Sequence, residues 1–330
     1  MNWNSLNKII SSSKNIILST HVNPDGDGIG SELGMYYYLK GIGKKCTIIN
    51  VSKTPVFLDF IDPEDIIEVW DDNIHVDFVK DVDLAIIFDI GDYKRLESVY
   101  KNIEKNHIYS VSIDHHPYDA DFFDLALVDT NYPATGHMVW DFLQYNNHRN
   151  LNIIQATALY ASLITDTGSF RYNSTNSACH LMASHLLECG VNPYDVYESI
   201  YERRSKEQLC LLSKSINNLN FYFNNTVCGS IITKKMQKES GANPSHVEGF
   251  TDFFRSINKV QIAFCIVEQK NNIRINFRSR GKYIINDIAK SFDGGGHKLA
   301  AGAIVENLSI SDIEQKIFNY LYKKKEDYVD

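Results

Sequence analysis

The sequence lacks the features that mark membrane proteins and disulfide-rich or zinc-binding proteins. None of its six cysteines forms a C-x-x-C pair, which argues against a zinc site and against a disulfide framework. No apolar run approaches the length needed to span a bilayer, and residues 1–13 lack the apolar core of a signal peptide. We therefore expect a cytoplasmic protein with no membrane partner.

An excess of positive charge is also absent. The 33 Lys and Arg residues are outnumbered by 41 Asp and Glu residues, which gives a formal net charge of −8. Proteins that hold long nucleic acids through the phosphates usually present a basic surface. We therefore expect no stable complex with long nucleic acid, and we expect any nucleic-acid substrate to be short or bound at one local basic patch.

The pattern of apolar residues predicts two α/β domains in this chain of 330 residues. Strand-like runs at 15–19, 46–51, 84–88 and 108–113 alternate with helical stretches, which predicts a mostly parallel sheet with helices on both faces. Strand-like alternation returns at 226–233, 260–268 and 272–277. We expect a first domain at 1–200, a helical linker at 201–222 and a smaller second domain at 223–330.

The most informative stretch follows the first strand-like run, where His21, Asp25 and Asp27 fall within seven residues. Open α/β sheets bind ligands at the carboxyl ends of their strands. Two acidic groups this close repel each other unless a cation lies between them, so the stretch predicts a metal site. A dinucleotide fingerprint would require glycine where the chain has Leu33. A plain Asp/Gly turn is the other alternative.

Three further segments end in acidic or imidazole side chains. Asp89 follows the run 84–88, Asp114-His115-His116 follow the run 108–113, and Asp166 follows the helical stretch 156–165. Each segment alone is also compatible with a helix cap or a turn, but four on one sheet edge predict a shared site.

The ligand types in these segments favour a two-metal centre. Two divalent cations would balance the charges of the four aspartates, Asp25, Asp27, Asp89 and Asp166. Mixed histidine and carboxylate ligands favour Mn²⁺, with Mg²⁺ or Co²⁺ as substitutes. Two such cations can clamp a phosphoryl oxygen, which predicts phosphoester hydrolysis.

These motifs, in this order, resemble those of the DHH phosphoesterases, whose name describes the sequence Asp114-His115-His116. The segment 292–302, with Gly294-Gly295-Gly296 followed by His297 and Lys298, is similar to the glycine loop of the DHHA1 domain. Length and motif order are most similar to the NrnA-like branch of oligoribonucleases and pAp phosphatases. The resemblance implies a Rossmann-like DHH domain linked to a smaller DHHA1 domain, with the active site in the interdomain cleft.

The resemblance also implies a role for each matching residue. One metal would be held by His21, Asp25 and Asp89, and the other by Asp27, Asp89, His115 and Asp166. Catalytic roles fall to Asp89 as the shared ligand, to Asp114 as the residue that orients the ring of His115, and to His116 beside the substrate phosphate. The expected substrate-binding residues are Arg278, Ser279, Arg280, Gly294, Gly295, Gly296, His297 and Lys298.

The function implied by the resemblance is hydrolysis of short oligoribonucleotides (nanoRNA) to mononucleotides, with removal of the 3′-phosphate of 3′-phosphoadenosine 5′-phosphate (pAp). One alternative is a phosphodiesterase for linear or cyclic dinucleotides of the pApA or c-di-AMP type. Another is a non-catalytic nucleotide-binding protein on the same fold, which the complete set of ligands disfavours. The sequence leaves open the oligomeric state, including a homodimer, and the roles of Arg95 and Glu248.

Overall fold

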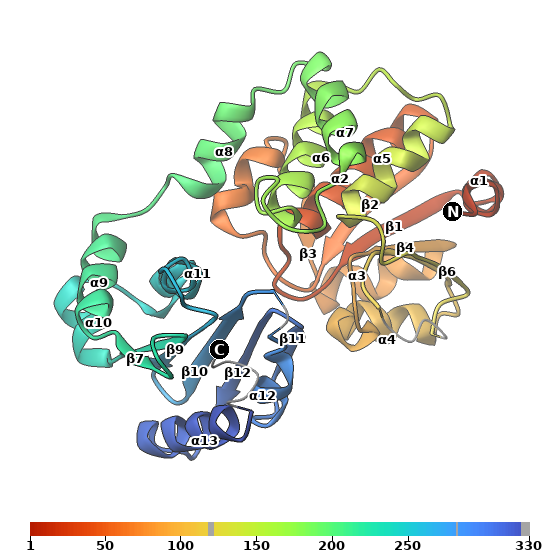
Figure 1. Cartoon of the computed structure of the whole chain (residues 1–330). Coiled ribbons are helices and arrows are strands. Elements are labelled where there is room, and N and C mark those ends of the chain that lie inside the picture. Colours follow the sequence, from red (N-terminus) through yellow and green to blue (C-terminus); the bar gives the residue numbers. More distant parts are fainter. Residues whose placement is uncertain (118–121, 282, 325–330) are drawn as a thin grey trace. The chain divides into compact units, whose positions relative to one another are not determined.

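A computed structural model describes residues 1–117, 122–281 and 283–324, and in it the chain divides into two compact units (Figure 1). The first unit is Met1–Arg203 and the second is Arg204–Asp330. The segment 201–222, expected as a linker, contains a helix and a short strand that both begin after the first unit has ended. Among the described residues, no helix is long and apolar enough to cross a membrane.

The first unit is built on a parallel sheet in the strand order β3-β2-β1-β4-β5-β6. Its strands are β1 (Asn15–Thr20), β2 (Lys45–Asn50), β3 (Ile67–Val69), β4 (Leu84–Phe88), β5 (Tyr109–Asp114) and β6 (Leu125–Val128). The strands predicted at 15–19, 46–51, 84–88 and 108–113 are thereby confirmed to within one residue at each end. The short strands β3 and β6 were not predicted.

Helices cover both faces of this sheet, as the alternating pattern predicted. They are α1 (Trp3–Ser12), α2 (Gly26–Gly41), α3 (Asp72–Phe78), α4 (Glu97–Lys105), α5 (Thr135–Tyr145), α6 (Ile153–Asp166), α7 (Ser177–Glu188) and α8 (Pro193–Tyr201). Short 3-10 turns lie at Val56–Ile61, Val79–Asp81 and Tyr93–Leu96. Leu84, Ile86 and Phe88 of β4 pack with α2, α5 and α6, whereas Ala85 and Ile87 pack with α4 on the other face. Strand β4 is therefore a continuous apolar run, as expected for a central strand of a parallel sheet buried on both faces.

Helix α2 begins earlier than the sequence predicted. The glycine-rich residues after His21 are typical of a turn, and the sequence pattern alone predicts a helix only over 31–40. Instead Asp25 caps the helix, because its carboxylate accepts from the backbone N–H groups of Asp27 (3.0 Å) and Gly28 (3.2 Å). A β-carbon on Gly28 would lie 2.3 Å from Thr20 Oγ1, and one on Gly30 would lie 2.3 Å from the Ala158 carbonyl. These glycines allow α2 to approach β1 and α6.

A buried carboxyl group on α2 connects the helix to the ends of two strands. Glu32 is fully buried, and its Oε2 accepts from Asn50 Nδ2 at 2.9 Å. Asn50 Oδ1 in turn accepts from the backbone N–H of Thr20 at 3.0 Å. Burial raises the pKa of Glu32 to about 8. We conclude that Glu32 is largely neutral at pH 7.

The raised pKa of Glu32 predicts a specific pH dependence of stability. A carboxyl group whose pKa is higher in the folded state destabilises the fold as the pH rises through that pKa, here about 8. Between pH 7 and pH 9, the wild-type protein should therefore lose about 1 kcal/mol of unfolding free energy relative to Glu32→Gln. Denaturant unfolding at both pH values measures this difference, and Glu64→Gln at an exposed position is the control. Parallel pH profiles for wild type and Glu32→Gln would contradict it.

The second unit contains a mixed sheet in the order β11-β12-β10-β9-β8-β7, in which β8 and β9 are parallel. Its strands are β7 (Asn220–Tyr222), β8 (Val227–Ile232), β9 (Ile262–Glu268), β10 (Ile273–Ser279), β11 (Gly295–His297) and β12 (Ala300–Val305). Its helices are α9 (Lys206–Asn217), α10 (Lys234–Ser240), α11 (Phe250–Arg255), α12 (Asn286–Lys290) and α13 (Ile310–Lys323), with a 3-10 turn at Pro244–Val247. The strands predicted at 226–233, 260–268 and 272–277 are confirmed to within two residues.

Candidate metal centre

The predicted metal ligands of the first unit converge at the carboxyl edge of the parallel sheet. His21 follows β1, Asp89 follows β4, and Asp114 ends β5, and these three strands are neighbours. His115 follows Asp114 directly, and the other ligands come from helices: Asp25 and Asp27 from the start of α2, and Asp166 from the end of α6. Three groups of these side chains offer ligand atoms close enough to hold a metal ion: His21/Asp25/Asp89, Asp27/His115/Asp166 and Asp89/His115/His116.

Asp89 lies at the centre of this cluster. Its Oδ2 is 3.7 Å from His21 Nε2, and its Oδ1 is 3.1 Å from His116 Nδ1 and 3.6 Å from His115 Nε2. The residue adopts a left-handed backbone conformation with φ of +51°, which is uncommon for a non-glycine residue. Its N–H donates to the Ile113 carbonyl at 3.2 Å, which holds it in place between β4 and β5. Strained backbone of this kind is common at functional sites.

Asp27 is fully buried and is fixed by the first turn of α5. Its Oδ2 accepts from the backbone N–H of Thr135 at 2.7 Å, and its Oδ1 accepts from the N–H of Gly136 at 2.9 Å and from the Ser162 hydroxyl. The first N–H groups of a helix have no partner inside the helix and carry partial positive charge, so they stabilise a carboxylate there. Asp27 Oδ2 also lies 3.6 Å from His115 Nε2.

Gly136 is therefore expected to be required for the geometry of Asp27. A β-carbon at this position would lie 2.0 Å from Ser162 Oγ, the group that also bonds Asp27. We expect Gly136→Ala to weaken Mn²⁺ binding by about 10- to 100-fold, as is usual when the partners of a ligand are disturbed. Isothermal titration calorimetry measures the effect. Gly41→Ala, whose β-carbon meets nothing within 4 Å, is the control and should bind Mn²⁺ like wild type.

The predicted role of Asp114 needs correction. The resemblance implied that Asp114 orients His115, but the structure pairs Asp114 Oδ1 with the ring of His116, at 3.0 Å from Nδ1. The ring of His115 is oriented instead by the backbone carbonyl of Tyr132, 3.2 Å from its Nδ1. Asp114 Oδ2 accepts from the N–H groups of Ile90 and Gly91, both at 2.8 Å. Asp114 thus supports the loop that carries Asp89 and positions His116.

Arg95, whose role the sequence left open, lies beside the first ligand group. Its Nη2 is 2.6 Å from His21 Nδ1, and its Nη1 donates to the Ile90 carbonyl at 3.2 Å. Its own carbonyl accepts from the N–H of Val22 at 2.9 Å. Arg95 therefore contacts the segments that carry His21 and Asp89.

The close packing of carboxylates and imidazoles shifts the protonation of both. Burial, together with the charges of Asp89 and Asp166, raises the pKa of Asp27 well above its ordinary value. Burial alone would lower the pKa of each histidine. Their carboxylate neighbours nevertheless raise the pKa of His21 and of His115 to about 10, and that of His116 to about 11. The acidic cluster therefore favours bound positive charge. Without a metal, protons on the histidines supply that charge.

The cluster fits divalent cations by its donors as well as by its charge. With His115 Nδ1 directed at the Tyr132 carbonyl, Nε2 is the nitrogen left to act as a ligand. This Nε2 is buried and has no hydrogen-bond partner among the described residues. Asp27, Asp89 and Asp166 all place a carboxylate oxygen within 3.6 Å of it. These are the surroundings expected of a metal-binding imidazole.

The second unit brings most of its predicted substrate-binding residues to one end of its sheet. Arg278 and Ser279 end β10, which pairs with β12, and β12 pairs with β11 in the glycine loop. The Ser279 N–H donates to the Leu299 carbonyl at 2.9 Å, which places the segment after Lys298 beside the end of β10. The side chain of His297 lies outside the described part of the chain.

The structure gives Ser279, Gly294 and Gly296, which were predicted to bind substrate, contacts within the second unit. The Ser279 side chain is buried and donates to the Tyr283 carbonyl, so the structure does not present its hydroxyl at the surface. A β-carbon on Gly294 would lie 2.2 Å from the Gly302 carbonyl, and one on Gly296 would lie 2.6 Å from the Ala300 carbonyl. Gly295 has open space at this position. Two of the three glycines are thus required for packing against β12.

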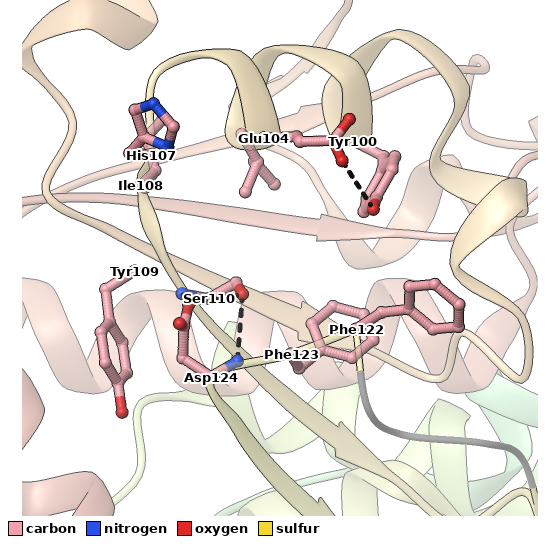
Figure 2. A pocket seen from close by; sticks show the side chains of 10 residues that line it. Tyr100, Glu104, His107, Ile108, Tyr109, Ser110, Phe122, Phe123 and Asp124 are labelled. Carbon is pink, nitrogen blue, oxygen red and sulfur yellow. Dashed lines mark hydrogen bonds between the residues drawn. The ribbon is translucent and has the colours of Figure 1, made fainter.

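A separate cavity of about 300 Å³ lies near the start of β5, away from the end that carries Asp114 (Figure 2). Aromatic rings of Tyr100, Tyr109 and Phe122 line it, and Ser110 donates to Asp124 with its N–H (2.7 Å) and its hydroxyl (2.9 Å). None of the predicted site residues lines this cavity.

Comparison with protein families assigns both units. The family model "DHH family, N-terminal domain" matches residues 15–164, and the model "DHHA1 domain" matches residues 225–323.

Individual proteins resemble this chain over nearly its whole length. A Thermus thermophilus protein named bifunctional oligoribonuclease and PAP phosphatase NrnA is 28% identical over 92% of this chain and 87% of its own. The Bacillus subtilis protein of the same name is 26% identical over 90% of this chain and 91% of its own. The crystal structure of an exopolyphosphatase-related protein from Bacteroides fragilis has a TM-score of 0.93 and 26% identity, covering 98% of this chain and 96% of that chain.

Two further similarities are more distant. The cyclic-di-AMP phosphodiesterase GdpP of Bacillus subtilis is 24% identical over 94% of this chain and 48% of its own length. A structure of the exonuclease RecJ bound to manganese shares the fold, with a TM-score of 0.55 and 11% identity over 97% of this chain and 93% of that chain. The order of the two domain models and the near full-length relatives lead to one conclusion: the chain belongs to the DHH family, with an N-terminal DHH domain followed by a DHHA1 domain.

Proposed function

We propose that this protein is a metal-dependent phosphoesterase that hydrolyses short oligoribonucleotides to mononucleotides and also removes the 3′-phosphate of pAp. The observation that carries the proposal is the position of Asp89, whose carboxylate is a member of two separate ligand groups at one sheet edge. A carboxylate shared between two sites is the arrangement that two-metal hydrolysis requires. The names of the relatives from Thermus thermophilus and Bacillus subtilis support the choice of substrates.

Two divalent cations would be held by the predicted ligands, one by His21, Asp25 and Asp89, and the other by Asp27, Asp89, His115 and Asp166. Bound there, the cations would supply charge stabilisation at the phosphoryl group and activation of water. Manganese is our preferred metal, with Mg²⁺ or Co²⁺ as substitutes, because the ligands combine imidazoles with carboxylates. The manganese in the RecJ structure, which shares the fold, agrees with this choice.

The protein's own side chains would hold and neutralise the substrate. His116 lies beside Asp89 and Asp114, and its pKa of about 11 keeps it protonated at neutral pH. A protonated imidazole at this place can stabilise negative charge on the scissile phosphate or give a proton to the leaving oxygen. In the second unit, Arg278, Arg280 and Lys298 would bind substrate phosphate, with the N–H groups of the glycine loop as further donors.

We also propose residues 1–200 as the catalytic domain, 201–222 as the linker and 223–330 as the substrate-binding domain. The net charge of −8 favours short RNA and small nucleotides over long nucleic acid as partners. A cytoplasmic location is part of the proposal, whereas the oligomeric state, including a homodimer, is left open.

A hydrolysis assay with Mn²⁺ tests the proposed function. The substrates are 5′-labelled RNAs from dinucleotides to a long control, together with pAp, pyrophosphate and a linear adenosine dinucleotide. We expect the shortest RNAs to be hydrolysed preferentially and pAp to release phosphate. Hydrolysis of long RNA at the same rate as dinucleotides would contradict the proposal. Absence of turnover with Mn²⁺ shown to be bound would instead favour a nucleotide-binding protein.

The similarity to GdpP favours one second candidate, a phosphodiesterase for cyclic or linear dinucleotides. The same metal ligands would serve that reaction. Turnover confined to the linear adenosine dinucleotide or to cyclic di-AMP, with no loss of other short RNAs, would decide for it.

A further inference from the structure

Two arginines of the second unit share one carboxylate, and a third arginine is bonded to one of them. Arg278 Nε donates to Asp252 Oδ2 at 3.0 Å, and Arg255 Nη2 donates to Asp252 Oδ1 at 3.1 Å. Asp252 and Arg255 belong to α11, whereas Arg278 and Arg280 lie at the end of β10. We refer to Asp252, Arg255, Arg278 and Arg280 as the arginine cluster. Asp252 and Arg255 were not among the residues predicted to bind substrate.

Arg255 attaches the end of α11 to β10 by further hydrogen bonds. Its Nη1 donates to the Ser279 carbonyl at 3.3 Å, and its own carbonyl accepts from Arg280 Nη2 at 2.5 Å. The residues on both sides of Ser279 are therefore held by α11, Arg278 through Asp252 and Arg280 through the Arg255 carbonyl. The two carboxylate oxygens of Asp252 each take one arginine, so the cluster is cross-linked rather than a set of separate side chains.

Donors remain available in this cluster. A guanidinium group has five N–H donors. Arg278 uses one on Nε for Asp252 and one on Nη1 for the Phe277 carbonyl at 3.0 Å, which leaves three without a partner among the described residues. Its side chain is 34% exposed, so these donors can reach solvent. Three guanidinium groups and one carboxylate leave the cluster with net positive charge.

The contact with Asp252 explains how such donors can be oriented. A free arginine side chain has many rotamers, and ordering it on binding costs conformational entropy. Asp252 fixes Arg278 before any ligand binds and occupies its Nε. The remaining Nη donors form a planar fork, which matches two oxygens of a phosphate group.

We propose that Asp252 and Arg255 are positioning residues that hold Arg278 for binding a terminal phosphate monoester of the nucleotide substrate. The proposal rests on the proposed function, because it concerns the phosphate of the same class of substrate. Arg278 is already a proposed phosphate ligand, and the addition is that its preference for nucleotides with a terminal phosphate should depend on Asp252 and Arg255 of α11.

Binding of 5′-AMP and 3′-AMP compared with adenosine tests the proposal in the full-length, Mn²⁺-loaded protein. Calorimetry should show tighter binding of at least one monophosphate than of adenosine. Asp252→Asn should weaken that binding by about tenfold, the usual size of a lost positioning contact, and leave adenosine unchanged. Asp287→Asn is a matched control, because Asp287 forms a similar i,i+3 ion pair with Lys290 on α12 in the same unit.

A kinetic measurement separates positioning from damage to the fold. With a dinucleotide that carries a terminal phosphate, Asp252→Asn should raise KM about tenfold at nearly constant kcat. The small diester bis(p-nitrophenyl) phosphate has no terminal monoester, so its turnover should not change. Arg255→Met should raise KM to the same extent. Arg255→Lys should raise KM less, because the positive charge is kept.

Two outcomes would overturn the proposal. One is equal binding of the monophosphates and adenosine by the wild-type protein. The other is an Asp252→Asn variant that behaves like Asp287→Asn, or that loses adenosine binding and diester turnover to the same extent. A failure of the proposed function is distinguishable from both, because it appears as absent RNA turnover in the wild-type protein, while the binding measurement needs no turnover.

Discussion

Asp89→Ala is expected to lower kcat/KM for short RNA by roughly 10³-fold or more, which corresponds to about 4 kcal/mol of lost transition-state stabilisation. The reason is the central place of this carboxylate, which lies 3.1–3.7 Å from nitrogen atoms of His21, His115 and His116. Its removal takes a ligand from both proposed metal sites at once. The fold should persist, because no described backbone N–H depends on this side chain, and far-ultraviolet circular dichroism checks that.

Asp129→Asn provides a matched control for this experiment. Asp129 also follows a strand of the parallel sheet, β6, and its carboxylate accepts from Asn131 at 3.0 Å and 2.8 Å. It is absent from the groups of described residues that could hold a metal. We expect Asp129→Asn to retain near wild-type turnover. An Asp89→Ala variant that also retained it with Mn²⁺ would show that the shared-ligand assignment is wrong.

The sequence predicted the central strands well because their physical signal is local. Strands β1, β4 and β5 are buried on both faces, so each is rich in apolar residues and is followed by, or ends in, polar residues. Strand β3 lacks that signal, because its three residues are only partly buried. The start of α2 was placed too late because Gly26, Gly28 and Gly30 indicated a turn. Their actual role is close packing against β1 and α6, which depends on residues far away in the sequence.

The candidate ligands could be predicted because metal chemistry selects residue types, whereas the atoms that orient them often could not. Asp27 is held by the backbone N–H groups of Thr135 and Gly136, and His115 by the carbonyl of Tyr132. A backbone group is present in every residue, so no side-chain pattern indicates which one will be used. Asp252 and Arg278 are 26 positions apart, and only the pairing of α11 with β10 brings them together.

Mn²⁺ affinity is expected to rise steeply between pH 6 and pH 9. His21 and His115 have pKa values of about 10 in the metal-free protein, because Asp25, Asp27, Asp89 and Asp166 surround them. A metal binds only the deprotonated imidazole nitrogen, so each of these histidines must release a proton on binding. The apparent affinity should therefore increase about tenfold per pH unit for each proton released, and up to about 100-fold per unit if both are released.

Calorimetric titrations in buffers of different ionisation enthalpy count the released protons directly. His115→Asn should lower the proton count by about one, because it removes one of the two ligand histidines whose pKa is raised. The control His107→Asn, at an exposed position, should keep the wild-type count. An affinity that is flat from pH 6 to pH 9 would contradict the assignment of His21 and His115 as ligands.

The same protonation affects stability with the opposite sign. A histidine whose pKa is raised on folding stabilises the fold fully below its unfolded pKa of about 6.5, and this stabilisation is lost as the pH rises through about 10. The metal-free protein should thus become less stable from pH 6.5 upward, over the range in which Mn²⁺ binds more tightly. Bound cations would then replace the lost protons as the positive charge that the buried carboxylates require, so the stabilisation by Mn²⁺ should be largest at the alkaline end.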